Sequence, residues 1–190
     1  MGNNESKQAA KLFLNHAWFG NEREFTSLLL RDSSLLNKQN EFGNNALIRS
    51  SWRGHIAIVN ILVQHKPMAS LDLQNKDGWA ALTNASICGH VDVARVLLLN
   101  GCALNTCSKD GNDALSYAKE WGRTAIVALI EEEGRWRRRR SWVMFSSMFK
   151  KSLLASTSTS TDDTSPSGDI SVVEKALAMD EITRIISGFL

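Results

Sequence analysis

The sequence lacks the features that mark membrane-spanning, secreted and strongly basic proteins. It has no run of about 18 apolar residues, which argues against a membrane-spanning helix, and its start, MGNNESK, does not resemble a secretory signal peptide. Its three cysteines are an odd number without framework spacing, as expected in a reducing compartment. A net charge of +2 is too small for general nucleic-acid binding. These absences favour an intracellular protein without a nucleic-acid partner.

Motifs for chemistry are also missing. The sequence contains no nucleophile elbow and no phosphate-binding loop. Cys88, His90, Cys102 and Cys107 do not have the spacing of a common metal site, and the carboxylates at 131–133 are better interpreted as a solvated helix end. We therefore expect no enzymatic activity, no cofactor, no metal and no small-molecule substrate.

The sequence does contain a frame that occurs three times. Three glycines, 35 and 33 residues apart, each precede an Ala-Leu pair, and another glycine follows seven residues after that Leu. The first set is Gly43, Gly78 and Gly111, and the second set is Gly54, Gly89 and Gly122. An apolar pattern of helical period follows each second glycine. The frame predicts a helix, a glycine-centred turn, a second helix and a loop, and such units must stack to bury their apolar faces.

The frame resembles the ankyrin repeat. GHIAIVNILVQ and GHVDVARVLLLNGCALN match the second half of that motif closely, and LFLNHAWFGNEREFTSLLLRDSSLLN is similar enough to be a fourth, N-terminal unit. The first half departs from the motif: its Thr-Pro is replaced by Asn45-Ala46, Ala80-Ala81 and Asp113-Ala114, and its His by Ile48, Thr83 and Ser116. In the family this His ties neighbouring turns by hydrogen bonds, so the resemblance implies a softer array. Asn45 and Asp113 stand where helix N-caps are expected.

The expected fold class is all-α, an ankyrin-repeat solenoid of helix-turn-helix units with extended loops and a partly disordered C-terminal tail that contains helices. The expected parts are a flexible N-terminus (1–5), the array (6–134), a basic-aromatic helical segment (135–154), a disordered Ser/Thr-rich linker (155–169) and an amphipathic C-terminal helix (170–190). A tethered C-terminal helix suits either docking on another protein or folding back onto the array.

The resemblance implies that the loop tips and inner helices form a concave surface for a protein partner. The residues predicted to contact it are Phe42, Asn44, Arg49, Trp52, Lys76, Asp77, Trp79, Asn84, Ile87, Lys109, Asp110 and Asn112. Large aromatic side chains are typical of interface hot spots, although Trp52 and Trp79 are equally compatible with packing between units. For Trp18 and Trp121, in the end units, packing is favoured. Mixed charge at the loop tips argues against a polyanion at that rim.

Two segments suggest a membrane surface. Gly2 followed by Ser6 fits an N-myristoylation pattern, with a disordered start and a capping role for Ser6 as the alternative. A basic patch could supply the second signal that one acyl chain needs; it comprises Arg135, Arg137, Arg138, Arg139, Arg140, Lys150 and Lys151. The same segment suits three other roles: a cap on the open end of the array, a target helix for a Ca²⁺ sensor, or a nuclear import signal.

The function expected from these features is that of a non-catalytic scaffold or adaptor that binds an unidentified protein partner. The expected location is the cytoplasm, with an inner membrane face of anionic lipid and the nucleus as alternatives. The competing interpretation is a regulatory or inhibitory subunit that acts in the cytosol or nucleus. A repeat frame alone names no partner, because the same fold serves unrelated ligands.

Overall fold

The computed structural model describes residues 2–65 and 69–157, and all regular structure in this part of the chain is helical. The elements are α1 (Gly2–Phe19), α2 (Glu22–Arg31), the 3-10 helix η1 (Ser33–Leu35), α3 (Ala46–Arg53), α4 (Ile56–Gln64), α5 (Ala81–Cys88), α6 (Val91–Leu99), α7 (Ala114–Glu120) and α8 (Thr124–Thr157). The chain divides into two units, residues 1–131 and 132–190. The expected all-α class is confirmed.

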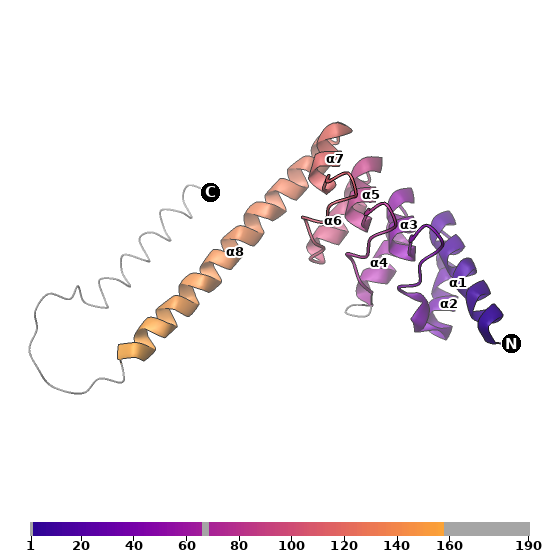
Figure 1. Cartoon of the computed structure of the whole chain (residues 1–190), viewed down its shortest axis with the longest axis horizontal. Helices are drawn as coiled ribbons and strands as arrows, with labels where there is room; N and C mark the ends of the chain where they lie inside the picture. The colour runs from indigo at the N-terminus through magenta and orange to yellow at the C-terminus, as the bar shows by residue number, and fades with distance from the viewer. Residues whose placement is uncertain (1, 66–68, 158–190) are drawn as a thin grey trace, which may run out of the picture. The chain divides into compact units, whose positions relative to one another are not determined.

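The first unit is a stack of helix pairs. Helices α1, α3, α5 and α7 contact one another in that order and form an inner layer, while α2, α4 and α6 contact in order and form an outer layer (Figure 1). Each inner helix of the first three pairs also packs on its own outer helix. A continuous apolar core runs between the layers and includes Phe13, Phe25, Leu62, Leu97 and Ile126, all at most 1% exposed. Sharing this core across pairs is what stabilises units too small to fold alone.

Local signals in the sequence define where the inner helices begin and end. The side-chain Oδ1 of Asn45 accepts a hydrogen bond from the Ile48 N–H (2.8 Å), and Asp113 caps α7 in the same way through the Ser116 N–H (2.8 Å). Ala80, at the same point before α5, offers no such cap. At the other end, Gly54 has a φ of 75°, a left-handed conformation in which a residue without Cβ is unstrained. The two predicted N-caps are confirmed.

Neighbouring repeats are tied through the residue that follows each turn glycine. The Nε2 of His55 donates to the Trp18 carbonyl oxygen and that of His90 to the Trp52 carbonyl oxygen, each at 3.0 Å. Arg123 occupies the same place in the last repeat, and its Nε donates to the Ile87 carbonyl oxygen at 3.2 Å. The missing His in the first half of each repeat suggested a softer array. The hydrogen bonds between repeats come instead from His55 and His90 in the second half.

The loops between repeats are joined by a second set of hydrogen bonds. The Lys76 N–H donates to the Phe42 carbonyl oxygen, and the Lys109 N–H donates to the Asp77 carbonyl oxygen, each at 3.0 Å. The Nε2 of Gln74 donates both within its own loop, to Gly78 O (2.6 Å), and to Cys107 O of the next loop (2.8 Å). These bonds hold the predicted contact residues at the loop tips in a fixed register.

The structure differs from the expected boundaries at both ends of the array. Helix α1 begins at Gly2 instead of after residue 5, with Glu5 in its first turn, where a carboxylate favours a helix N-terminus. Helix α8 passes through the expected break at 134/135 and ends at Thr157, inside the segment expected to be a disordered linker. The Arg137 Nε donates to the Glu133 carboxylate across that break (2.8 Å), an i,i+4 pair that supports a continuous helix.

The rest of the predicted linker (158–169) and the predicted C-terminal helix (170–190) lie outside the described residues. Within the described ranges, no helix combines the length and the apolar character needed to cross a membrane.

Candidate protein-binding groove

A row of aromatic side chains crosses the inner layer. The Trp52 ring, at the end of α3, stacks on the Trp79 ring of the next loop, with centroids 5.8 Å apart and an angle of 17°. The Trp79 ring in turn meets Tyr117 of α7 edge-on (6.2 Å, 79°), and its Nε1 donates to the Tyr117 hydroxyl at 3.3 Å. The Tyr117 hydroxyl donates to Ser108 Oγ at 3.0 Å. This aromatic row (Trp52, Trp79 and Tyr117) links three successive repeats.

Cationic side chains extend the row toward the N-terminus. The guanidinium groups of Arg49 and Arg53 lie 5.1 and 5.2 Å from the centroid of the Trp18 ring, within the range of a cation–π interaction. Burial lowers the pKa of Arg49, but an arginine remains protonated at neutral pH. Its positive charge is therefore held against an aromatic face in a half-buried position.

Between these side chains lies a groove of about 250 Å³. Its lining comprises Trp18, Phe42, Asn44, Ile48, Arg49, Trp52, Asn75, Asp77, Trp79 and Asn84. Phe42 is 60% exposed, and the two rings of the Trp52–Trp79 stack are half-buried. Aromatic surface that is already rigid, yet still partly exposed, can be buried by a ligand with little loss of side-chain entropy.

The groove gathers seven of the twelve predicted contact residues: Phe42, Asn44, Arg49, Trp52, Asp77, Trp79 and Asn84. Asn84 is only 1% exposed, and its Nδ2 donates to the Ala80 carbonyl oxygen (2.8 Å), so it can contribute only to the floor. The other five (Lys76, Ile87, Lys109, Asp110 and Asn112) do not line the groove. Of these, Ile87 and Asn112 are half-buried, while the rest are exposed at loop tips.

The tryptophans had two interpretations, contact with a partner and packing between repeats, and the structure places each ring differently with respect to them. Trp52 and Trp79 pack on each other between repeats and still line the groove. Trp18 packs under two arginines and lines it as well, a placement that single-repeat reasoning missed. For Trp121 the favoured packing interpretation is wrong, because this ring is 55% exposed at the C-terminal cap of the short helix α7.

The basic patch belongs to the second unit and is considered by itself. Arg135, Arg138 and Arg140 are exposed on α8, and Arg137 and Arg139 are half-buried. On the same helix Trp136, Trp142 and Met144 are 54%, 38% and 69% exposed. Lys150 and Lys151 lie further along α8. The helix therefore offers exposed cations and exposed apolar side chains together.

Comparison with known proteins agrees with this architecture. Residues 67–136 match the family described as ankyrin repeats, in three copies. The chain is 33% identical over 94 residues to the human Notch-regulated ankyrin repeat-containing protein, covering 48% of this chain and 81% of that protein. It is 32% identical over 73 residues to ankyrin repeat-containing protein ITN1 of Arabidopsis thaliana, covering 38% of this chain and 12% of that protein.

A third relative is an enzyme. The chain is 32% identical over 81 residues to the human NAD-capped RNA hydrolase NUDT12, and this match covers 43% of the chain but only 17% of the hydrolase. The chain thus spans a small part of NUDT12 and of ITN1 and most of the Notch-regulated protein.

Stacked helix pairs with a groove across their inner layer define a helical-repeat protein of the kind that binds other proteins. The chain belongs to the ankyrin-repeat proteins, as the resemblance in its sequence indicated. Within the described residues, no group of three or more His, Cys, Asp or Glu side chains could hold a metal ion.

Proposed function

We propose that the protein is a non-catalytic scaffold or adaptor that holds a protein partner in the groove. The observation that carries this proposal is the Trp52–Trp79 stack, because it presents rigid aromatic surface inside a hollow lined by several of the predicted contact residues. Tryptophan and arginine are the side chains that contribute most often to interface hot spots. Arg49 and Trp18 supply the same combination at the other end of the groove.

Tryptophan substitution tests this proposal. Trp52→Ala is expected to weaken capture of the partner about tenfold or more in quantitative affinity purification, since hot-spot truncations exceed about 2 kcal/mol. Trp121→Ala is the matched control, because its ring is exposed outside the groove. Asp77→Lys changes an exposed groove residue without opening the aromatic row and shows whether any loss comes from binding or from folding. The proposal would be refuted if all three variants captured the partner as well as the unsubstituted protein does.

The competing proposal is a regulatory or inhibitory subunit in the cytosol or nucleus. A regulatory subunit would bind its partner through the same groove. The difference is that the partner's activity would change when this chain is added. Only 17% of NUDT12 is matched, so this similarity does not support a hydrolase activity in the present chain. We infer that the shared part is a repeat array.

A second proposal concerns location. The exposed arginines of α8, together with exposed Trp136, Trp142 and Met144, favour contact with an anionic membrane surface. Each basic residue near such a surface contributes about 1 kcal/mol, and myristate on Gly2 would add a second anchor. The other proposed roles of this segment, a Ca²⁺-sensor target, a nuclear import signal or an array cap, do not require lipid.

Membrane fractionation separates these roles. A Gly2→Ala variant is expected to lose most of its membrane-bound fraction, and an Arg138→Glu/Arg140→Glu variant is expected to lose a similar part of it, because one signal alone binds marginally. Arg95→Glu, an exposed charge reversal on α6, serves as the control. An unchanged membrane fraction in the Gly2→Ala variant would rule out the acyl anchor.

A further inference from the structure

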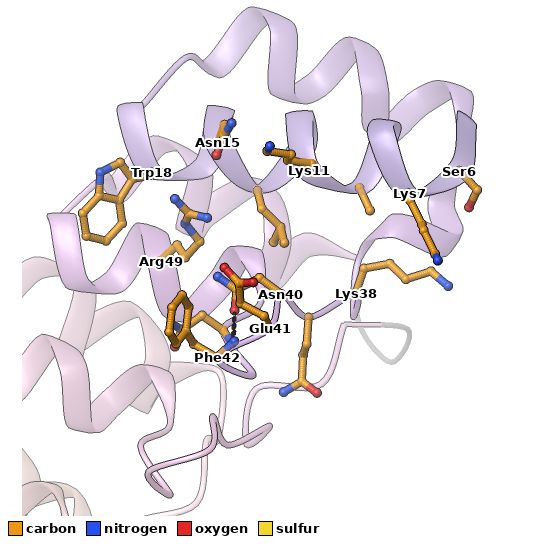
Figure 2. A pocket seen from close by; sticks show the side chains of 14 residues that line it. Ser6, Lys7, Lys11, Asn15, Trp18, Lys38, Asn40, Glu41, Phe42 and Arg49 are labelled. Atoms are coloured by element: carbon orange, nitrogen blue, oxygen red, sulfur yellow. Dashed lines mark hydrogen bonds between the residues drawn. The ribbon is translucent and has the colours of Figure 1, made fainter. Parts of the chain in front are cut away.

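A second hollow, the basic pocket, adjoins the groove at the N-terminal end of the array. It has a volume of about 1000 Å³ and lies between α1 and the loop of residues 38–44. Figure 2 shows Lys7, Lys11 and Trp18 along one helix, with other lining residues facing them. The charged side chains that line the pocket are four cations, Lys7, Lys11, Lys38 and Arg49, and one carboxylate, Glu41. The balance is strongly positive.

Within residues 2–65 and 69–157, the four cations form no ion pair with a carboxylate. The Nε of Arg49 is buried and has no hydrogen-bond partner among the described residues. The pocket is therefore suited to a negatively charged ligand with hydrogen-bond acceptors.

The spacing of the lining residues indicates an extended ligand. Lys7, Lys11 and Trp18 follow one another along α1 at intervals of four and seven residues and line the same pocket. At 1.5 Å per residue, the distance from Lys7 to Trp18 along the helix axis is about 16 Å. A single phosphate group cannot reach both ends, whereas an extended peptide of about five residues can.

We propose that the basic pocket binds an acidic, extended segment of a partner protein. Carboxylates of the segment meet Lys7, Lys11 and Lys38, and an apolar or aromatic side chain at its other end lies beside Trp18 and Phe42. This inference rests on the proposed function and specifies the chemistry of the partner. A concave site with exposed Phe42 at one end suits such a segment better than a flat lipid surface, and Glu41 within the lining disfavours a continuous phosphate backbone.

Fluorescence anisotropy with the full-length protein tests the proposal. The probe is a short fluorescein-labelled peptide in which a run of glutamates precedes a phenylalanine. The control peptide has the same length but carries glutamines in place of the glutamates, so it lacks their negative charge. Lys7 and Lys11 are exposed, so a Lys7→Glu/Lys11→Glu variant is expected to fold normally and to bind the acidic peptide about tenfold or more weakly. Arg95→Glu, with the same type of charge change on α6, is expected to bind it unchanged.

Several outcomes would overturn the inference: equal binding of the glutamine peptide, full affinity in the Lys7→Glu/Lys11→Glu variant, or equally tight binding of phosphatidylserine vesicles or single-stranded DNA through the same lysines. Tighter binding of a peptide with the sequence of residues 161–169 would assign the pocket to the chain's own acidic stretch instead. Trp52 lies outside this pocket, so the two proposals fail separately. Loss of the acidic preference with partner capture intact refutes only the inference, and Trp52→Ala with unchanged capture refutes only the groove.

Discussion

Replacing Gly78 by alanine is expected to lower the free energy of unfolding by about 3 kcal/mol or more. Gly78 has a φ of +83°, which an alanine adopts only with about 1–2 kcal/mol of strain. A Cβ at this position would also lie 2.8 Å from the Cα of Ser108 and 2.9 Å from the Lys109 N, both backbone atoms of the next loop. The clash therefore opposes the Lys109 N–H to Asp77 O hydrogen bond that joins the two repeats. Urea unfolding followed by circular dichroism measures the change.

Gly111 provides a matched control for this experiment. It occupies the same loop position one repeat later, with a φ of +80°, but a Cβ there would meet no atom within 4 Å. Gly111→Ala should therefore show the conformational strain alone, about 1–2 kcal/mol. Equal losses for the two variants would mean that the loops do not pack as closely as the structure shows.

Truncation of Leu97 is the second large effect expected. This side chain of α6 is completely buried between repeats, and Leu97→Ala should lower the free energy of unfolding by about 2–5 kcal/mol through lost apolar burial and the cavity that remains. Each repeat contacts only its neighbours, so we also expect a broader unfolding transition as the array separates at this point. Thermal and urea unfolding of the variant test both expectations.

The control for Leu97 lies two residues along the same helix. Leu99 is 77% exposed, and Leu99→Ala should change stability by less than about 0.5 kcal/mol. Because the two substitutions remove the same atoms from one helix, a difference in helix propensity cannot explain a different outcome. A large loss for Leu99→Ala would show that its surface is covered in solution.

Much of the candidate site could be predicted, but its limits could not. Trp52 and Trp79 were predicted from their positions within the repeat, Trp52 on an inner helix and Trp79 at a loop tip. Their stacking was not predictable, since it depends on how closely α3 and the following loop approach. Trp121 was misjudged because its place in an end unit favoured packing, whereas at the C-terminal cap of α7 it is 55% exposed.

The sequence by itself determined that the chain forms repeated helix pairs. Turn glycines, N-capping Asn45 and Asp113, and apolar positions of helical period act over a few residues, so they can be recognised without coordinates. Only the tertiary structure decided which repeats share a site. Lys7, Lys38 and Arg49 come from separate elements and meet in one pocket, and His90 reaches a carbonyl oxygen 38 residues away. Such contacts depend on the stacking of whole units, which no short stretch of the chain encodes.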